Sequence, residues 1–231
     1  MLVRDDLRAW LAVRAAVPWA EIGESIVEPV VGRRDGVVSY VDGAGWDSPR
    51  TDRLRVALAA ARAAPDLTLD RLADWHRIAM GARRAQSFRT VPAFAKGGRE
   101  RYGVDAGTSA EFENHLLEAA DPAVALAARA ARVYSDVCFF HPFSDGNARA
   151  AMLAIYHVLA RGGVVLDQAG PVLAVSRRAD DHAAALVLVR LVDVLIDATR
   201  ARCRGGPTTN DQDRRSSAHA GYSSSSTSIR R

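Results

Sequence analysis

Residues 141–149 read HPFSDGNAR, and this short polar run separates two strongly helical segments of the chain. On its N-terminal side, apolar residues between 121 and 140 recur at helical spacing. On its C-terminal side, the stretch 147–161 carries a second apolar face and ends at two glycines. The sequence therefore predicts two helices joined by a loop that is unusually rich in chemically active residues.

The loop has the features of a phosphate-binding site. A helix that begins near Asn147 presents N–H groups without intrahelical partners, and the helix dipole is positive there. Gly146 allows a phosphate oxygen to approach the backbone closely. Asn147 adds side-chain donors, and Arg149 adds a charged fork that suits phosphate. We expect these residues to bind phosphate groups.

Two further side chains of the loop suit chemistry at a phosphate. Asp145 is a hard oxygen ligand of the kind that Mg²⁺ uses when it bridges protein and nucleotide phosphates. His141 is the one residue of the run that exchanges a proton near neutral pH. A base, a metal ligand and a phosphate cradle in one loop are the minimum for moving a phosphorus-linked group onto a hydroxyl.

Most of the remaining chain has apolar residues at helical spacing, and this pattern is present again after Thr108. Apolar spacing predicts further helices over residues 5–16, 51–63, 69–80 and 177–200. Thr68 is the expected N-cap of the third of these, and Gly81 the residue past its end. We expect a mostly helical domain.

Two segments differ from this pattern. Residues 29–47 contain two valine pairs and several Gly and Asp, which suits short strands or loops. Residues 87–107 combine extended formers such as Phe88 and Val91 with the turn signal Lys96-Gly97-Gly98. This second segment predicts a β-hairpin with a loose tip.

Composition favours one substantial core and argues against nucleic-acid binding. The chain has 231 residues, 48% hydrophobic and 25% charged, with a formal charge of +4. Five arginines and two aspartates lie beyond residue 203, so the rest of the chain is close to neutral and shows no concentrated basic face. That tail, residues 204–231, is rich in Ser, Gly and Arg, and we expect it to be disordered.

No segment predicts a membrane or secreted protein. The N-terminus lacks the basic-then-apolar profile of a signal peptide. The most apolar stretch, residues 183–196, is too short to span a bilayer and contains Arg190 and Asp193. Cys138 and Cys203 form no disulfide or metal framework. We therefore expect a cytoplasmic protein.

Residues 141–149 resemble the signature of the Fic family, His-Pro-Phe-x-Asp/Glu-Gly-Asn-Gly-Arg-x-x-Arg, at all but one defined position. The resemblance extends over about residues 85–200 and includes Phe88-Arg89-Thr90, which is similar to the family's target-docking flap. It implies a Fic-like helical bundle with a β-hairpin flap before the active-site helix pair. The implied division is an N-terminal part over 1–84, a catalytic core over 85–203 and the tail over 204–231.

The family's site roles carry over to matching positions. The resemblance implies that His141 deprotonates the target hydroxyl and that Asp145 holds Mg²⁺. It also implies that phosphates bind at four consecutive loop residues: Gly146, Asn147, Ala148 and Arg149. ATP or another nucleotide is the implied donor.

Two positions depart from the signature. Ala148 replaces the second Gly and narrows the room beside the phosphates, but its N–H group remains. Met152 stands where the family has its closing Arg, which reaches the terminal phosphate of ATP. We therefore expect weakened selectivity for a triphosphate over a diphosphate, and diphosphate-linked donors become candidates alongside ATP.

The resemblance implies Mg²⁺-dependent transfer of a nucleoside monophosphate, or a related phosphate-linked group, to a hydroxyl. A Ser, Thr or Tyr of a protein is the first expectation for the acceptor, and a small molecule is the alternative. A second interpretation is an inactive Fic scaffold that binds a nucleotide or a partner as a regulator. A third is a toxin with a separate antitoxin. Ser109-x-x-x-Glu113-Asn114 resembles the family's inhibitory motif, but Glu113 would need the closing Arg, so we expect a solvated helix face.

Overall fold

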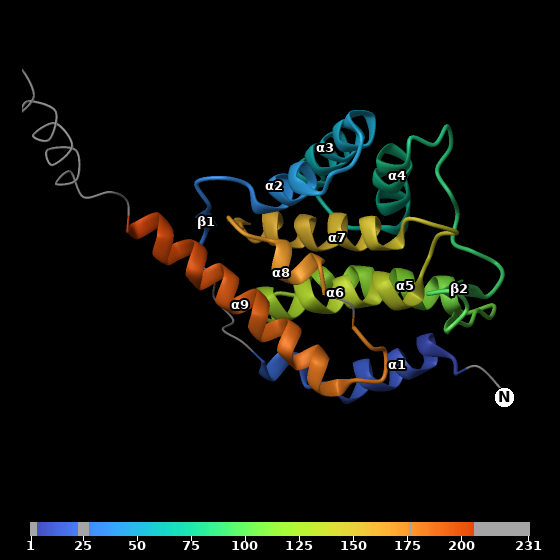
Figure 1. Cartoon of the computed structure of the whole chain (residues 1–231). Helices are drawn as coiled ribbons and strands as arrows, with labels where there is room; N and C mark the ends of the chain where they lie inside the picture. The colour runs from blue at the N-terminus through green and yellow to red at the C-terminus, as the bar shows by residue number, and fades with distance from the viewer. Residues whose placement is uncertain (1–3, 23–27, 176, 206–231) are drawn as a thin grey trace, which may run out of the picture.

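The computed structural model of the chain describes residues 4–22, 28–175 and 177–205 (Figure 1). The expectation of disorder in the tail falls almost wholly on residues 206–231, which lie outside the described residues. The helices of the described part are α1 Asp6–Ala16, α2 Gly36–Gly43, α3 Ser48–Ala63, α4 Leu69–Met80, α5 Thr108–Leu117, α6 Leu126–Phe140, α7 Asn147–Arg161, α8 Gly170–Leu173 and α9 His182–Arg204. Its strands are β1 Val30–Val31, β2 Ala93–Ala95, β3 Glu100–Tyr102 and β4 Val164–Val165.

Helices α6 and α7 lie side by side at the centre of the molecule (Figure 1). Nearly every residue of α6 is buried, as are most residues of α7. The sequence predicts a single apolar stripe on α6, but neighbours cover it on several sides, with α1, α5 and α9 packed around it. Helices α3 and α4 pack against α7. The loop between α6 and α7 is therefore held at one end of a closely packed helix pair.

Local capping signals predict the bounds of several helices correctly. Thr68 caps α4 by accepting a hydrogen bond from the backbone N–H of Arg71 at 3.3 Å, and Gly81 ends α4 with φ of 67°. The last helix starts later than expected, because Asp181 forms its N-cap, and it continues to Arg204. Helix α6 likewise starts at Leu126, five residues after the expected boundary.

The prediction of strands or loops over residues 29–47 is partly wrong. Val30 and Val31 do form a strand, which pairs in parallel with Val164 and Val165. Residues 36–43, however, form α2. The Asp35 side chain accepts hydrogen bonds from the N–H groups of Val37 and Val38, at 3.0 and 3.1 Å. This N-cap outweighs the preference of two adjacent valines for extended structure.

The predicted hairpin is present, with its strands at β2 and β3. The antiparallel register pairs Ala93 with Tyr102, and residues 96–98 turn with positive φ. The expected extended segment at 88–91 lies before β2 and is not part of the ladder.

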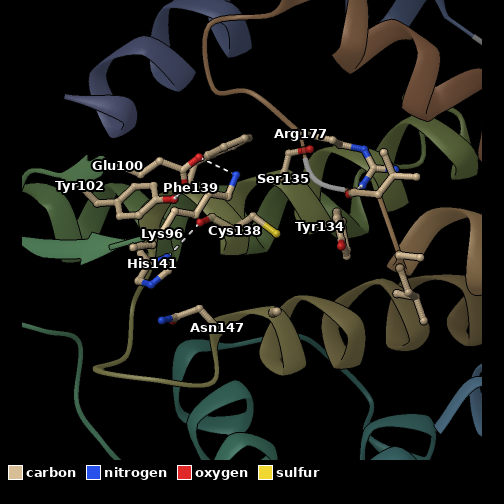
Figure 2. A pocket seen from close by; sticks show the side chains of 15 residues that line it. Lys96, Glu100, Tyr102, Tyr134, Ser135, Cys138, Phe139, His141, Asn147 and Arg177 are labelled. Atoms are coloured by element: carbon tan, nitrogen blue, oxygen red, sulfur yellow. Dashed lines mark hydrogen bonds and ion pairs between the residues drawn. The ribbon is translucent and has the colours of Figure 1, made fainter. Parts of the chain in front are cut away.

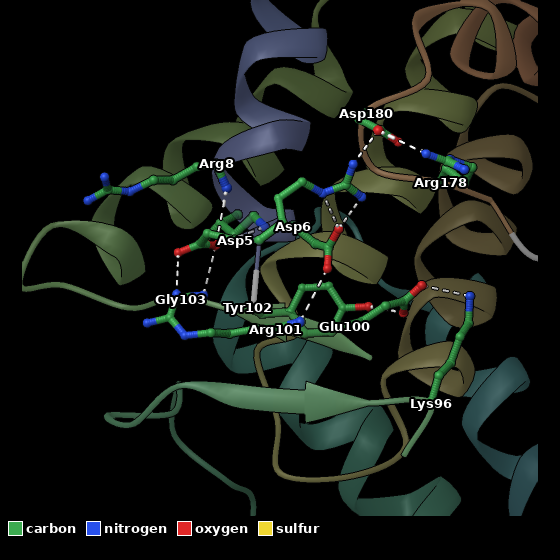
Figure 3. Close-up of polar contacts among 12 residues, drawn as sticks. Asp5, Asp6, Arg8, Lys96, Glu100, Arg101, Tyr102, Gly103, Arg178 and Asp180 are labelled. Atoms are coloured by element: carbon green, nitrogen blue, oxygen red, sulfur yellow. Dashed lines mark hydrogen bonds and ion pairs between the residues drawn. The ribbon is translucent and has the colours of Figure 1, made fainter. Parts of the chain in front are cut away.

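Two carboxylates at the start of α1 fix the hairpin to the helical body (Figure 3). The Asp5 side chain accepts a hydrogen bond from Gly103 N–H at 3.0 Å, and Asp6 accepts one from Arg101 N–H at 3.2 Å. Because β3 is held by α1, the hairpin lies at a fixed place beside the α6–α7 loop.

Helix α9 is the longest helix of the described part, with 23 residues. Neither α9 nor any other helix there combines the length and the unbroken apolar character that crossing a bilayer requires.

A buried charged network joins α1 to α6. Asp136 is fully buried and accepts hydrogen bonds from Trp10 Nε1 at 2.9 Å and from Arg14 Nε at 2.8 Å. Arg14 also pairs with Glu118 at 2.8 Å. Removing Asp136 would leave the Trp10 indole N–H without a partner and the buried Arg14 guanidinium with only Glu118, whose side chain is partly exposed.

We predict that Asp136→Ala lowers the free energy of unfolding by about 3–5 kcal/mol, because Arg14 stays buried while it loses its buried partner and keeps only the partly exposed Glu118. Urea denaturation followed by circular dichroism measures the change. Asp52→Ala is the matched control, since Asp52 is exposed and pairs with an exposed arginine; it should cost far less. Equal losses in the two variants would contradict the role of the buried network.

Candidate active site

His141 ends α6 in the left-handed conformation, with φ of 51° and ψ of 54°. This turn directs the chain away from the helix axis and is uncommon for a residue other than glycine. Asn147, the first residue of α7, closes the loop from the other side. Its Oδ1 accepts a hydrogen bond from Phe143 N–H at 2.9 Å, and its Nδ2 donates to Phe143 O at 2.8 Å.

These contacts change the expected role of Asn147. The sequence predicts that its side-chain donors bind phosphate, but the side chain is buried and both of its polar groups bond to Phe143. What Asn147 offers to a ligand is its backbone N–H. The side chain instead fixes the shape of the loop.

His76 of α4 contacts the loop through a hydrogen bond and a ring contact. Because a carbonyl oxygen only accepts, the 2.8 Å contact between His76 Nε2 and Asp145 O shows that Nε2 carries the proton and donates. The His76 ring also stacks on Phe143, with centroids 4.1 Å apart. Gly146 lies directly against this helix with φ of 77°, and a Cβ there would come within 2.7 Å of Met80 Sδ. Glycine is therefore required at this position for both its conformation and its size.

Arg89 ties the loop to the segment before the hairpin. Its guanidinium donates to four carbonyl oxygens: His141 at 2.9 Å, Phe140 at 3.1 Å, Gly103 at 2.6 Å and Val91 at 2.8 Å. Its backbone N–H donates to Pro142 O at 2.9 Å. The resemblance to the Fic family implies that Arg89 belongs to a target-docking flap; in the structure its side chain holds the end of α6 and the start of the loop.

The His141 ring has a defined proton position. Its Nδ1 lies 3.3 Å from Cys138 O, an acceptor, so Nδ1 carries the hydrogen and Nε2 is left with a lone pair. The ring stacks on Tyr102 of β3, with centroids 4.4 Å apart and planes within 7° (Figure 2). Burial lowers the pKa of His141, so the ring is mostly neutral at pH 7. A neutral imidazole with a free Nε2 can accept a proton.

Two cavities meet at His141. The first, of about 330 Å³, lies between the hairpin, α6 and the segment after α8 (Figure 2). The residues that line it include Lys96, Tyr102, Tyr134, Cys138 and Arg177. The second, of about 490 Å³, lies between α7, α3 and the loop. Both cavities share His141, Asn147 and Ala148 as lining residues.

The start of α7 faces this junction. Arg149 and Ala150 donate their N–H groups to Gly146 O, each at 3.0 Å. The N–H groups of Asn147 and Ala148 have no acceptor among the residues that the structure describes. Ala148 is exposed, so its methyl group lies at the wall of the cavities without covering the backbone. Two unpaired N–H groups at a positive helix end suit an anion.

Asp145 lies at the rim of the second cavity with 77% of its side chain exposed. Its Oδ1 accepts from Gly146 N–H at 2.6 Å, and its Oδ2 is 3.6 Å from Arg149 Nη2. Nowhere in the described ranges do three or more His, Cys, Asp or Glu side chains gather into a metal site. The single carboxylate fits Mg²⁺, which commonly takes one or two protein carboxylates and completes its shell with phosphate oxygens and water.

Met152 lines the second cavity, whereas Glu113 lies outside both cavities. Met152 is buried in the wall of the second cavity and offers no charge there. Glu113 is exposed on α5 and lines a separate groove with Ser109 and Gln86. The carboxylate of Glu113 is therefore part of neither cavity at His141.

Comparisons with known proteins find a matching family and structures of similar fold. Residues 66–159 match the model of the Fic/DOC family. Among solved structures, Fic-1 (residues 134–508) from C. elegans is 18% identical, with a TM-score of 0.53 over 87% of this chain and 71% of that chain. A Fic domain containing signaling protein from Bacteroides thetaiotaomicron is 16% identical, with a TM-score of 0.44 over 89% and 81%. No curated protein gives a significant match. The fold is mostly helical and Fic-like.

Four histidines of the described part, His76, His115, His141 and His157, have pKa values lowered chiefly by burial. Their neutral forms are favoured in the folded state, so protonation favours unfolding. Their contribution to stability is complete above the unfolded histidine pKa of about 6.5 and is lost as pH falls below it.

We therefore predict that the free energy of unfolding decreases as pH is lowered from 7.5 to 5.5. Carboxyl groups titrate below this window, so the decrease reports mainly on histidines. Urea denaturation at several pH values measures it, with a His157→Gln variant expected to show a shallower pH dependence. A stability that is constant or increasing over this range would contradict the prediction.

Proposed function

We propose, on the premise that residues 66–159 form a Fic domain, that the chain transfers a nucleoside monophosphate, or a related phosphate-linked group, to a hydroxyl in a Mg²⁺-dependent reaction. One observation carries the proposal. The neutral His141, with a free Nε2, lies where the second cavity, with its unpaired backbone N–H groups and arginines, meets the first, more apolar cavity. A proton acceptor and an anion site are thus adjacent.

In the proposed reaction, His141 Nε2 takes the proton of the acceptor hydroxyl as its oxygen attacks phosphorus. A new oxygen–phosphorus bond forms, and the bond to the leaving phosphate breaks. The N–H groups of Asn147 and Ala148, with the Arg149 guanidinium, bind the phosphate oxygens as negative charge develops. Asp145 would hold Mg²⁺, which neutralises charge on the phosphate chain when bound.

The proposed acceptor is a Ser, Thr or Tyr of a protein. The β2–β3 hairpin is a two-stranded sheet fixed beside His141, and an extended peptide can add to the edge of such a sheet through backbone hydrogen bonds. Phe94 of β2 is 58% exposed and also lines the second cavity, so an apolar contact for a bound peptide is available. A small hydroxyl compound is the alternative acceptor.

Met152 favours a second candidate function. Without a charge at this position, the same cavities could bind a nucleotide or a partner without turnover, as in a regulatory scaffold. In a third interpretation, the active enzyme is a toxin that a separate antitoxin inhibits. Mass spectrometry of cell lysate incubated with the protein, Mg²⁺ and a nucleotide panel distinguishes transfer from binding alone.

We predict that His141→Ala reduces transfer by about two to four orders of magnitude, the usual contribution of a general base. The fold should persist, because the ring stacks at the cavity wall and is only half buried. His182→Ala, at the exposed start of α9, is the control and should keep full activity. Near-normal turnover by a folded His141→Ala protein would remove the proposed base.

We predict that transfer stops in excess chelator and returns on addition of Mg²⁺ or Mn²⁺. Asp145→Asn should raise the Mg²⁺ concentration needed for half-maximal activity, because an amide oxygen is a weaker ligand than a carboxylate. Asp74→Asn, an exposed carboxylate on α4, serves as the control. A reaction that proceeds equally well in chelator would overturn the assignment of Asp145.

A further inference from the structure

The second cavity has a cationic wall, and residues 141–149 contribute only Arg149 to it, from the first turn of α7. The other arginine that lines it is Arg50, from α3, a helix far from the loop in sequence. Because α3 packs against α7, Arg50 lies on the same cavity as Met152 and Arg149. Arg50 therefore adds a positive charge to the cavity from outside the signature. Met152, which lines the same cavity, is uncharged.

Arg50 is held in place without a partner for its charge. Its guanidinium lies over the Trp46 ring, 4.7 Å from the centroid. Its Nε is buried and lacks a hydrogen-bond partner, and the described residues provide no ion pair for it. Arg55 on the same helix differs, because it pairs with Asp42 and Asp52. A positioned arginine without a counter-charge, lining a cavity, is a candidate for anion binding.

The surroundings of Arg149 indicate an excess of positive charge. The pKa of Arg149 is lowered by burial first, and then by the nearby charges of Arg50 and Arg53. Arg53 packs over Gly81 at the end of α4, and its Nε is also buried without a partner. Among the described residues, the carboxylate in contact with Arg149 is that of the exposed Asp145, 3.6 Å away. A bound polyanion would offset the repulsion among these three guanidinium groups.

We propose that Arg50 binds the phosphate farthest from the transferred group, together with Arg149, and so replaces the charge that Met152 does not supply. The site then prefers nucleoside triphosphates to diphosphates, the opposite of the expectation from Met152 alone. The inference rests on the proposed function only in taking a nucleotide as the ligand. Arg50 lies outside the matched residues 66–159, so the family signature gives no indication of it.

The test measures binding and needs no turnover. Calorimetry is performed on the full chain carrying His141→Ala, with Mg²⁺ and with ATP, ADP, AMP or inorganic tripolyphosphate as separate ligands. Fluorescence of Trp46, which contacts Arg50, gives a second signal. We expect ATP to bind more tightly than ADP. Arg50→Gln should weaken ATP and tripolyphosphate about tenfold or more, as expected for loss of a charged hydrogen bond, and leave AMP unchanged.

Two further variants make the result specific. Arg50→Lys keeps a positive charge and should retain more ATP affinity than Arg50→Gln. Arg55→Gln, on the same helix but paired at the surface, should change no affinity. Equal binding of ATP and ADP, or an equal loss of AMP and ATP in Arg50→Gln, would overturn the role of Arg50. Absence of transfer by the wild-type protein would overturn the proposed function instead, and would leave these affinities as they are.

Discussion

The close packing of α6 against α7 is the constraint on which the site depends. Alanines with no exposed surface, including Ala127, Ala130, Ala150 and Ala154, lie along the two helices. Small side chains allow helix axes to approach closely, and packed interiors resist displacement. Because both ends of residues 141–146 are fixed by this pair, the loop cannot relax without separating the helices. The left-handed turn at His141 persists under that restraint.

Most hydrogen bonds around the loop hold its backbone. His76, Arg89 and Asn147 each bond to loop carbonyl or N–H groups. The groups that remain for a ligand lie at the cavities: the Nε2 of His141, the N–H groups of Asn147 and Ala148, the Asp145 carboxylate and the Arg149 guanidinium. Such a division suits catalysis, because donors fixed in advance need no reorganisation when charge develops. The supporting residues come from α4, from the segment before the hairpin and from α7.

Features encoded by neighbouring residues could be predicted from the sequence. The N-cap Thr68, the terminal Gly81 and the hairpin turn at 96–98 all depend on short-range preferences, and the structure confirms them. The α2 helix is not predicted, because its valine pair favours a strand and the decisive contact is the cap at Asp35. The structural role of the Asn147 side chain is not predicted either. Its residue type indicates hydrogen bonding, but only the folded loop determines the partner. Arg50 carries no local signal, since its role arises from the packing of α3 on α7.

The cost of burying an unpaired charge accounts for both the uncharged Met152 on α7 and the charged Arg50 on α3. Met152 is only 3% exposed and contributes to the packed wall of α7. An arginine there would bury charge whenever the cavity lacked an anion, and buried charge without a partner is costly. Arg50 is less buried and lies over an aromatic ring, which stabilises a cation partly removed from water. Charge on α3 can thus serve a phosphate while α7 keeps an apolar face. In the proposed site, the terminal phosphate needs a positive charge at one position in space, and α3 can provide it as well as α7.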